Sequence, residues 1–257
     1  MTFEDFVARR EAERAFAYAN GYNNGDAATN GEYACLDALL AEADVLVDVG
    51  ANEGLFAARA AARTPAPRIL AFEPNPAHRA LIESRLAGAG RLEGVALGDK
   101  PGSATLHIHA THHATASLTD RPRMSPRFRA EMTTVEVPVR RLDDWADELA
   151  GARLLIKIDA EGFEPLIFQG MEGILGRSPG AAIVTEVSIA HWQRFGDPPE
   201  LLDRVRGARR LYLIGHDGKL TPIKIADLRS RVSPEFVSYV LLLPDRIDML
   251  DKIQRFL

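Results

Sequence analysis

Five short apolar runs, separated by segments of helical pattern, constrain the fold of this chain most. The runs span residues 45–50, 68–73, 91–97, 153–159 and 181–187. They are largely Val, Ile, Leu and Ala along their length, as in strands that are covered on both faces. Strands that alternate with helices build a parallel sheet with helices on either side. We therefore predict an α/β fold with a mostly parallel sheet.

The rest of the chain fills in this layout. Helices are expected in the segments between the runs, over residues 56–63, 76–87, 163–175 and 198–208. Two segments, 103–109 and 134–141, alternate apolar and polar residues, and we expect them to pair with each other. A loop rich in His, Thr, Arg and Pro, residues 110–133, lies between them. The apolar runs 211–215 and 236–243 have no clear helix between them and predict a terminal antiparallel pair.

The N-terminal segment has a different pattern from the rest. Residues 3–19 read as an amphipathic helix, 20–31 as a polar loop and 32–40 as a second helix. Because the composition does not break along the 257 residues, we predict one domain over 1–257. It would consist of an N-terminal helical cap, 1–40, and a cofactor-binding core, 41–257.

Composition limits the location and the partners. The formal net charge of -5 argues against a protein that follows a nucleic-acid backbone, because that function needs a basic surface. The single cysteine, Cys35, cannot form an internal disulfide. The charged N-terminus lacks a signal-peptide core, and no apolar run reaches the roughly 20 residues of a membrane helix. We therefore expect a cytoplasmic protein that binds neither nucleic acid nor membrane.

The turn after the first run has the chemistry of a ligand site. In the segment 48–54, DVGANEG, Gly50 allows a tight turn and close approach of a ligand. Asp48, near the strand end, can accept a hydrogen bond from an ammonium group. Ligands of open α/β sheets bind beyond the carboxyl ends of the strands. An ordinary strand-to-helix turn is the alternative for this segment alone.

A second anchor, Glu73, ends the next run and can accept both hydroxyls of a ribose. The turn lacks the G-x-G-x-x-G pattern of a dinucleotide site, and Glu53 would repel a pyrophosphate there. These features argue against an NAD-type oxidoreductase. A cofactor with a ribose and a positive ammonium but no phosphate fits better, and S-adenosyl-L-methionine is such a molecule.

The chain resembles the FkbM-type methyltransferases from about Asn30 to Asp245. The segments that carry the resemblance are NGE at 30–32, VDVGANEG at 47–54, AFEPNP at 71–76, VALGD at 95–99, VPVRRLDDW at 137–145, KIDAEGFEPLIFQGM at 157–171 and Glu186. The most specific of them is KID-x-EG followed by a helix. The chain departs from the family's usual pattern at Ala160 and Phe163, which puts the local packing and the pocket shape in doubt.

The resemblance implies a class I methyltransferase fold, with a seven-stranded sheet and a reversed terminal hairpin. It also implies S-adenosyl-L-methionine as methyl donor and, usually, O-methylation of a hydroxyl on a sugar, natural product or other small molecule. By position, the methionine part of the cofactor would lie against Asp48, Gly50, Asn52 and Gly54. The ribose would bind Glu73, flanked by Pro74 and Asn75, and the adenine would lie near Leu97, Gly98 and Asp99. Glu32 would reach the cofactor from the N-terminal helix.

Asp159 is the main catalytic candidate, because it would end a strand next to the transferred methyl group and could accept the acceptor's proton. Its alternative role is to cap the following helix. Glu161 and Glu164 suit the first turn of that helix and are expected to be structural. Asp159 and Glu186 could hold a divalent metal that activates a hydroxyl, but two carboxylates are a thin ligand set and a metal is not favoured.

The loop 110–133 is expected to cover the pocket, and it supplies further candidates. His112, His113 or Ser117 could act as the base or contact the acceptor. His107 and His109 could bind zinc on one face of a strand, although histidines in such a pattern are more often simply polar surface residues. His191 and Trp192 could line the acceptor site, or Trp192 could pack at a helix start.

A catalytically silent, cofactor-binding or scaffolding member of the same fold is the alternative function. The sequence predicts neither the identity of the acceptor nor the oligomeric state.

Overall fold

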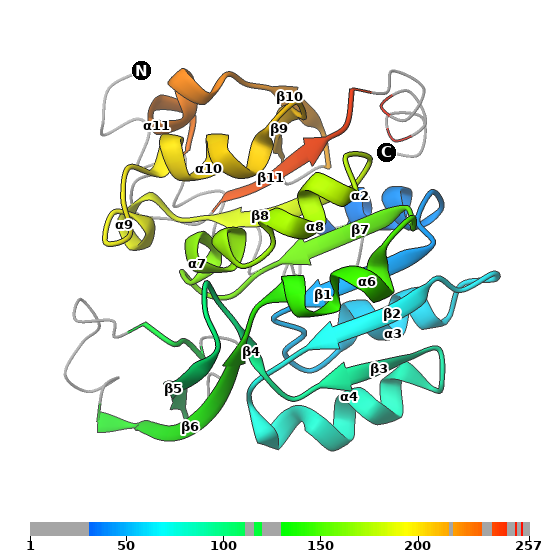
Figure 1. The fold of residues 1–257 in the computed structure, drawn as a ribbon, viewed down its shortest axis with the longest axis vertical. Helices are drawn as coiled ribbons and strands as arrows, with labels where there is room; N and C mark the ends of the chain where they lie inside the picture. Colours follow the sequence, from blue (N-terminus) through cyan, green and yellow to red (C-terminus); the bar gives the residue numbers. More distant parts are fainter. Residues whose placement is uncertain are drawn as a thin grey trace, which may run out of the picture.

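The computed structural model describes residues 31–110, 116–119, 130–215, 218–232, 238–245, 250 and 253. Its centre is an eight-stranded sheet, shown in Figure 1, with the strand order β10-β9-β11-β8-β7-β1-β2-β3. These strands are β1 (Val45–Val49), β2 (Arg68–Phe72), β3 (Gly90–Glu93), β7 (Leu154–Ile158), β8 (Ala182–Val187), β9 (Arg210–Ile214), β10 (Leu220–Pro222) and β11 (Ser238–Leu243). Strands β3, β2, β1, β7 and β8 run parallel, which confirms the predicted α/β class.

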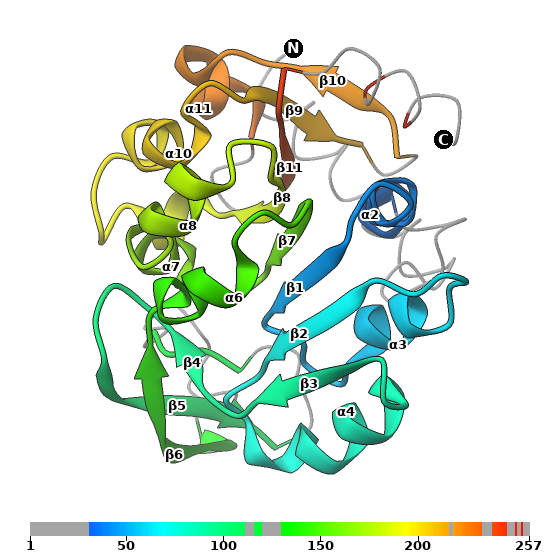
Figure 2. The same ribbon diagram turned by 45° about the vertical axis from the view of Figure 1, so that its right-hand side comes forward.

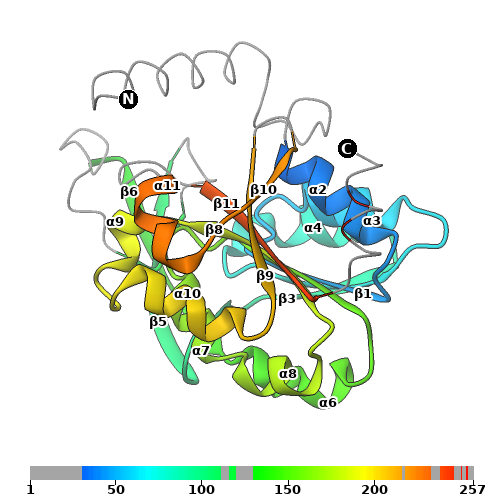
Figure 3. The ribbon, with the colours of Figure 1, turned by 90° about the horizontal axis from the view of Figure 1, so that it is seen from above.

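Helices cover both faces of this sheet, as Figure 3 shows. One face carries α2 (Gly31–Leu40), α3 (Leu55–Ala61) and α4 (Arg79–Leu86), the last preceded by the short helix η1 (Pro76–His78). The other face carries η3 (Leu142–Trp145), α6 (Ala146–Leu149), α7 (Glu164–Gln169), α8 (Glu172–Arg177), α9 (Ile189–Trp192), α10 (Pro198–Arg206), η4 (Ile225–Asp227) and α11 (Leu228–Arg231). No helix in the described ranges is both long and apolar enough to cross a membrane.

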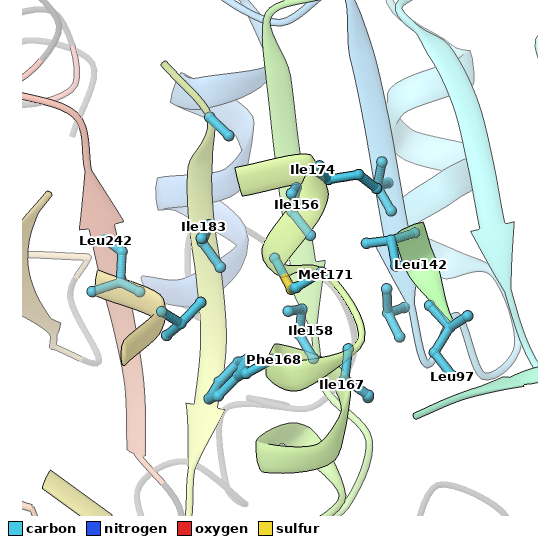
Figure 4. Packing of buried hydrophobic residues seen from close by; sticks show 14 of the residues in the cluster. Leu97, Leu142, Ile156, Ile158, Ile167, Phe168, Met171, Ile174, Ile183 and Leu242 are labelled. Atoms are coloured by element: carbon cyan, nitrogen blue, oxygen red, sulfur yellow. The ribbon is translucent and has the colours of Figure 1, made fainter. Parts of the chain in front are cut away.

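Two hydrophobic clusters hold the helices on the sheet. Because successive side chains of a strand point to opposite faces, Val45 and Val47 enter one cluster and Leu46 the other. Figure 4 shows how Phe168 and Met171 lie against the strand residues Ile156 and Ile158. Each aliphatic side chain that is fully buried in this way stabilises the fold by about 1.5–3 kcal/mol. The sheet is therefore a rigid platform for the residues at its strand ends.

A second, three-stranded sheet, with the order β4-β6-β5, stands beyond the carboxyl ends of β1 and β2 (Figure 2). It contains β4 (Ala96–Leu97), β5 (Gly102–His109) and β6 (Met132–Arg140). The antiparallel pairing of β5 with β6 confirms the predicted pairing of 103–109 with 134–141. The prediction of one strand over 91–97 was wrong. The chain leaves the first sheet after β3 and bends at Gly94 and Val95 before it enters the second.

The seven-stranded expectation was also wrong, because β10 adds an eighth strand at the sheet edge beside β9. The predicted terminal antiparallel pair is confirmed, with β11 inserted between β8 and β9. The helix expected over 163–175 is broken into α7 and α8. A Cβ atom at Gly170 would lie 2.0 Å from the carbonyl oxygen of Gly98, so the chain turns there in close contact with a neighbouring loop. The helix predicted over 3–19 lies outside the described residues.

Candidate functional site

A cavity of about 390 Å³ opens between the carboxyl ends of the central strands and the second sheet. This volume falls within the roughly 300–1,000 Å³ that is typical of small-molecule sites. Of the residues that the sequence singled out for the cofactor, those on the cavity wall are Glu32, Gly50, Asn52, Glu73, Pro74, Leu97 and Asp159. Those that are not among its lining residues are Asp48, Gly54, Asn75, Gly98 and Asp99. His112 and His113 lie outside the described residues.

The turn after β1 requires glycine for a reason that the sequence did not predict. Gly50 has a φ of 73°, and a Cβ atom there would lie 1.8 Å from the carbonyl oxygen of Asp159. The space that Gly50 leaves open is therefore occupied by the end of the neighbouring strand rather than reserved for a ligand. Gly54, with a φ of 77°, caps the start of α3, where a Cβ atom would press on Ile82 at 3.2 Å. Both glycines thus fix the path of the turn that forms the cavity wall.

This geometry predicts that Gly50→Ala destabilises the protein far more than Gly88→Ala. Both glycines have positive φ, at 73° and 82°, so both variants carry the same left-handed strain of about 1 kcal/mol. Nothing lies within 4 Å of a Cβ atom at Gly88, whereas at Gly50 the β7 end would have to move. Urea unfolding should show a loss of about 3 kcal/mol or more for Gly50→Ala. Equal losses for the two variants would contradict the close contact.

Glu73 lies directly after β2 on the cavity wall, and its carboxylate is held by two backbone amides. The Asn52 amide donates to Oε2 and the Asn75 amide to Oε1, both at 2.8 Å. The Asn75 side chain in turn accepts from the Ala77 amide at 3.1 Å and caps η1. Burial raises the pKa of Glu73 to about 7, although the two amides oppose that shift. The orientation of Glu73 is therefore set by the turns on either side of it.

The raised pKa of Glu73 predicts how stability depends on pH. The folded protein holds this proton up to about pH 7, whereas an unfolded glutamate releases it near 4.5. The contribution of Glu73 to stability is therefore present below pH 4.5 and is lost as the pH rises through 7, by about 3 kcal/mol in all. Glu73→Gln should remove this loss, so the wild type and Glu73→Gln should diverge in urea unfolding between pH 5 and 8. The exposed variant Glu172→Gln should follow the wild type, and a Glu73→Gln curve parallel to the wild type would contradict the prediction.

Asp48 lies beneath the turn rather than on the cavity wall. Its side chain is completely buried, and its Oδ1 atom is 3.5 Å from the ammonium Nζ of Lys157 on the adjacent strand. The two residues are register partners in the parallel pair of β1 and β7. Burial raises the pKa of Asp48, and the Lys157 ammonium opposes that shift.

Asp159 follows β7 and faces the cavity with a quarter of its side chain exposed. The Tyr239 hydroxyl, from β11, donates to its Oδ2 atom at 3.3 Å. The alternative role of Asp159 was to cap the following helix, but the N-cap residue of α7 is Phe163, and among the described residues no side chain makes a cap hydrogen bond there. The Glu164 carboxylate accepts from the amides of Ala160 and Gly162, at 2.8 and 3.1 Å, ahead of α7. The side chain of Asp159 is thus directed to the cavity.

The other carboxylates near Asp159 take different positions. Glu164 is fully buried and also accepts from the Trp192 indole at 2.8 Å, in agreement with a structural role. Glu161 does not lie in the first turn of α7 as expected. It precedes the helix with a φ of 54° and lines the cavity, because the turn 160–163 comes between β7 and α7. Glu186 also lines the cavity, and burial followed by the charges of Glu161 and Asp159 raises its pKa well above the ordinary value.

The remaining candidates lie around the cavity wall. Trp192 is fully buried in the core, and His191 packs against Gly162, so neither is among the lining residues. Ser117 is buried, and its hydroxyl donates to the carbonyl of Glu161 at 2.9 Å. The residues that the structure describes, including His107 and His109, contain no group of three or more His, Cys, Asp or Glu side chains that could hold a metal.

Lys157 and Tyr239 are among the residues at the site that the sequence did not single out. Lys157 is the one charged residue in the strand Leu154–Ile158, and this isolated charge in an apolar run was a signal for a buried partner. Tyr239 lies in the apolar run 236–243, which also contains Phe236. An aromatic residue in such a run does not by itself indicate a hydrogen bond to Asp159.

Comparisons with known proteins agree with this geometry. A family model for the methyltransferase FkbM domain matches residues 48–212, more than half of the chain. "Methyltransferase 1" of Beauveria bassiana (strain ARSEF 2860) is 29% identical over 146 residues, which are 49% of this chain and 58% of that protein. The matched segment thus spans less than two thirds of the length of this relative.

Solved structures of low identity also match the chain. An O-methyltransferase from Bacillus cereus in complex with S-adenosylhomocysteine has a TM-score of 0.42 at 12% identity, over 91% of this chain and 89% of that one. The O-methyltransferase TomG from Streptomyces achromogenes, in complex with S-adenosylmethionine, has a TM-score of 0.40 at 16% identity, over 83% and 78%. The match of the family model includes the glycine turn, Glu73 and Asp159. The chain therefore belongs to the FkbM methyltransferase family.

Proposed function

We propose that this protein transfers the methyl group of S-adenosyl-L-methionine to a hydroxyl of a small molecule such as a sugar or a natural product. One observation carries the proposal. A single cavity has Glu73 and Asp159 on its wall, and the Gly50 turn lies between the two strand ends that bear them. This layout suits a cofactor whose ribose lies at one end of the cavity and whose reactive centre lies at the other.

The residues on the cavity wall fit this cofactor chemically. The carboxylate of Glu73, already oriented by two amides, retains lone pairs for a ribose. Asn52 has a buried Oδ1 atom without a hydrogen-bond partner in the described structure, which suits the ammonium or a hydroxyl of the cofactor. Leu97 and Phe72 supply an apolar surface for the adenine ring of the cofactor. The cofactor would supply an electrophilic methyl group on a sulfonium.

The acceptor would bind at the Asp159 end. There Asp159 can accept the proton of the acceptor hydroxyl, and Tyr239 fixes the orientation of its carboxylate. Glu186 has a buried Oε2 atom without a partner among the described groups, and this atom can contact a polar substituent of the acceptor. Methyl transfer needs donor carbon and acceptor oxygen close and in line, which a cavity between two sheets favours.

Calorimetric titration of the purified protein tests the cofactor proposal. S-adenosylhomocysteine should bind with a 1:1 stoichiometry, whereas NAD should give no signal at the same concentration. Binding of NAD alone would overturn the proposal in favour of an oxidoreductase.

Turnover is tested separately, by mass spectrometry of a panel of sugars and phenolic natural products incubated with S-adenosyl-L-methionine and the protein. A mass increase of one methyl group in a hydroxyl-bearing compound is the expected result. Tight binding of S-adenosylhomocysteine without methylation of any compound class would favour a catalytically silent member of the fold.

A further inference from the structure

Lys157 is a buried cation in the middle of the apolar strand β7. Its side chain is 7% exposed, although lysine is rarely buried unless its charge is paired. The ammonium Nζ lies 3.5 Å from Oδ1 of Asp48, 3.4 Å from the carbonyl oxygen of Gly50 and 3.9 Å from Oδ2 of Asp159. Its three partners thus belong to the end of β1, the glycine turn and the end of β7.

We propose that Lys157 is a positioning residue for the methionine end of the cofactor, which holds the Gly50 turn against Asp159 and favours the charged form of the carboxylates around it. This inference rests on the proposed function. Lys157 is not among the lining residues of the cavity, so it acts through Gly50 and Asp159, which are.

The backbone explains why a cation is placed at this point. Asp48 and Lys157 are register partners, and the ladder between the strands continues through the bond from the Asp159 amide to the Val49 carbonyl at 3.1 Å. Beyond that bond Gly50 packs directly against the carbonyl of Asp159. The hydrogen bond from the Lys157 ammonium to the Gly50 carbonyl links β7 to the turn after β1, at the point where the backbone ladder has ended.

The titratable groups around Lys157 lie on the neighbouring segments β1, α2 and the end of β7. They are Asp48 on β1, Asp159 after β7, and Glu32 and Tyr33 on α2. Burial alone would lower the pKa of Lys157, but these acids outweigh it and raise the pKa, so the ammonium stays protonated. In return, Lys157 opposes the effect of burial on Glu32, whose pKa is raised to about 8. Without the ammonium, the acids on the wall would take up protons more readily.

The loss of this cation should affect one end of the ligand only. We compare S-adenosylhomocysteine with 5′-methylthioadenosine, which has the same adenosine and sulfur but lacks the amino-acid part. Lys157→Met should weaken S-adenosylhomocysteine by about 10–30-fold, the upper part of the range for a residue that acts without touching the ligand. It should leave 5′-methylthioadenosine within about threefold, since that ligand depends on Glu73 and the apolar wall. Equal losses for both ligands, or none, would overturn the proposal.

Further variants separate positioning from folding. Lys157→Arg keeps the charge and should retain S-adenosylhomocysteine affinity within about tenfold. The double variant Asp48→Asn/Lys157→Met removes both buried charges and should regain thermal stability without regaining the affinity. Recovery of both would show that Lys157 has only a structural role. Lys224→Met, at an exposed site remote from the cavity, is the matched control and should bind like the wild type.

The pH profile gives an independent readout. Protonation of the carboxylates around Lys157 should weaken S-adenosylhomocysteine binding at low pH. In Lys157→Met the pH of half-maximal affinity should rise by about one pH unit, because these carboxylates lose the nearby positive charge of the ammonium. An unchanged profile contradicts the proposal. Failure of the wild type itself to bind S-adenosylhomocysteine would instead overturn the proposed function.

Discussion

Glu73→Ala should weaken the binding of S-adenosylhomocysteine by about 10²-fold or more, since two hydrogen bonds from ribose hydroxyls to a charged carboxylate are lost at about 1.5–3 kcal/mol each. The carboxylate is pre-oriented by the amides of Asn52 and Asn75, so the wild type orders no side chain when it binds the ribose. Removal of the side chain also leaves those two amides without their acceptor. Calorimetry at pH 8, above the pKa of about 7 at which Glu73 ionises, measures the full effect.

Two variants make this result specific. Glu73→Gln keeps the shape but provides one acceptor oxygen in place of two, and its affinity should fall between those of the wild type and the alanine variant. Glu93→Ala removes the carboxylate that ends β3, the next strand in the sheet, which is not among the cavity residues. It should bind like the wild type. If folded Glu73→Ala retained wild-type affinity, Glu73 would not be part of the cofactor site.

The parts of the fold that the sequence predicted correctly are those with local causes. The strand Val45–Val49 is buried at each position, and its apolar sequence alone predicts a buried strand. The turn after it could be predicted because Gly50 and Gly54 are glycines. Both adopt a positive φ in the structure, which few other residues tolerate. The placement of Glu73 and Asp159 at strand ends followed from the parallel topology, since parallel strands end at the same edge.

The errors arose where distant contacts decide the structure. The run 91–97 was predicted as one strand, but its two halves pair with β2 and β6 in different sheets. The break between α7 and α8 is set by the approach of Gly170 to Gly98, which are far apart in the sequence. The surroundings of Asp48 also depend on a distant contact. Its position in the motif predicts a ligand contact, and the structure places its carboxylate 3.5 Å from the ammonium of Lys157 on the neighbouring strand.

Asp159 is the residue on which the proposed chemistry depends most. It is partly exposed to the cavity, lies at the carboxyl end of the strand beside β1, and receives the Tyr239 hydroxyl on one oxygen. An acceptor hydroxyl in the cavity would share this carboxylate with Tyr239. The N-cap residue of α7 is Phe163 and no side chain in the part of the chain that the structure describes makes a cap hydrogen bond there, so the side chain of Asp159 is not required to start that helix. A loss of activity on its substitution would therefore reflect chemistry rather than an unfolded helix.

Asp159→Asn should lower turnover by about 10² or more on an acceptor that the wild type methylates, the scale for the loss of a positioned base. The amide keeps the shape of the carboxylate and can still accept from Tyr239, so S-adenosylhomocysteine affinity should stay within about tenfold. Single-turnover kinetics at saturating cofactor separates the chemical step from binding. Addition of a chelator to the wild type examines whether Asp159 and Glu186 act through a divalent metal, and unchanged activity would leave Asp159 as the base without a metal. If Asp159→Asn turned over like the wild type, the base would have to be another group, and His112, His113 and His191 would be the next positions to substitute.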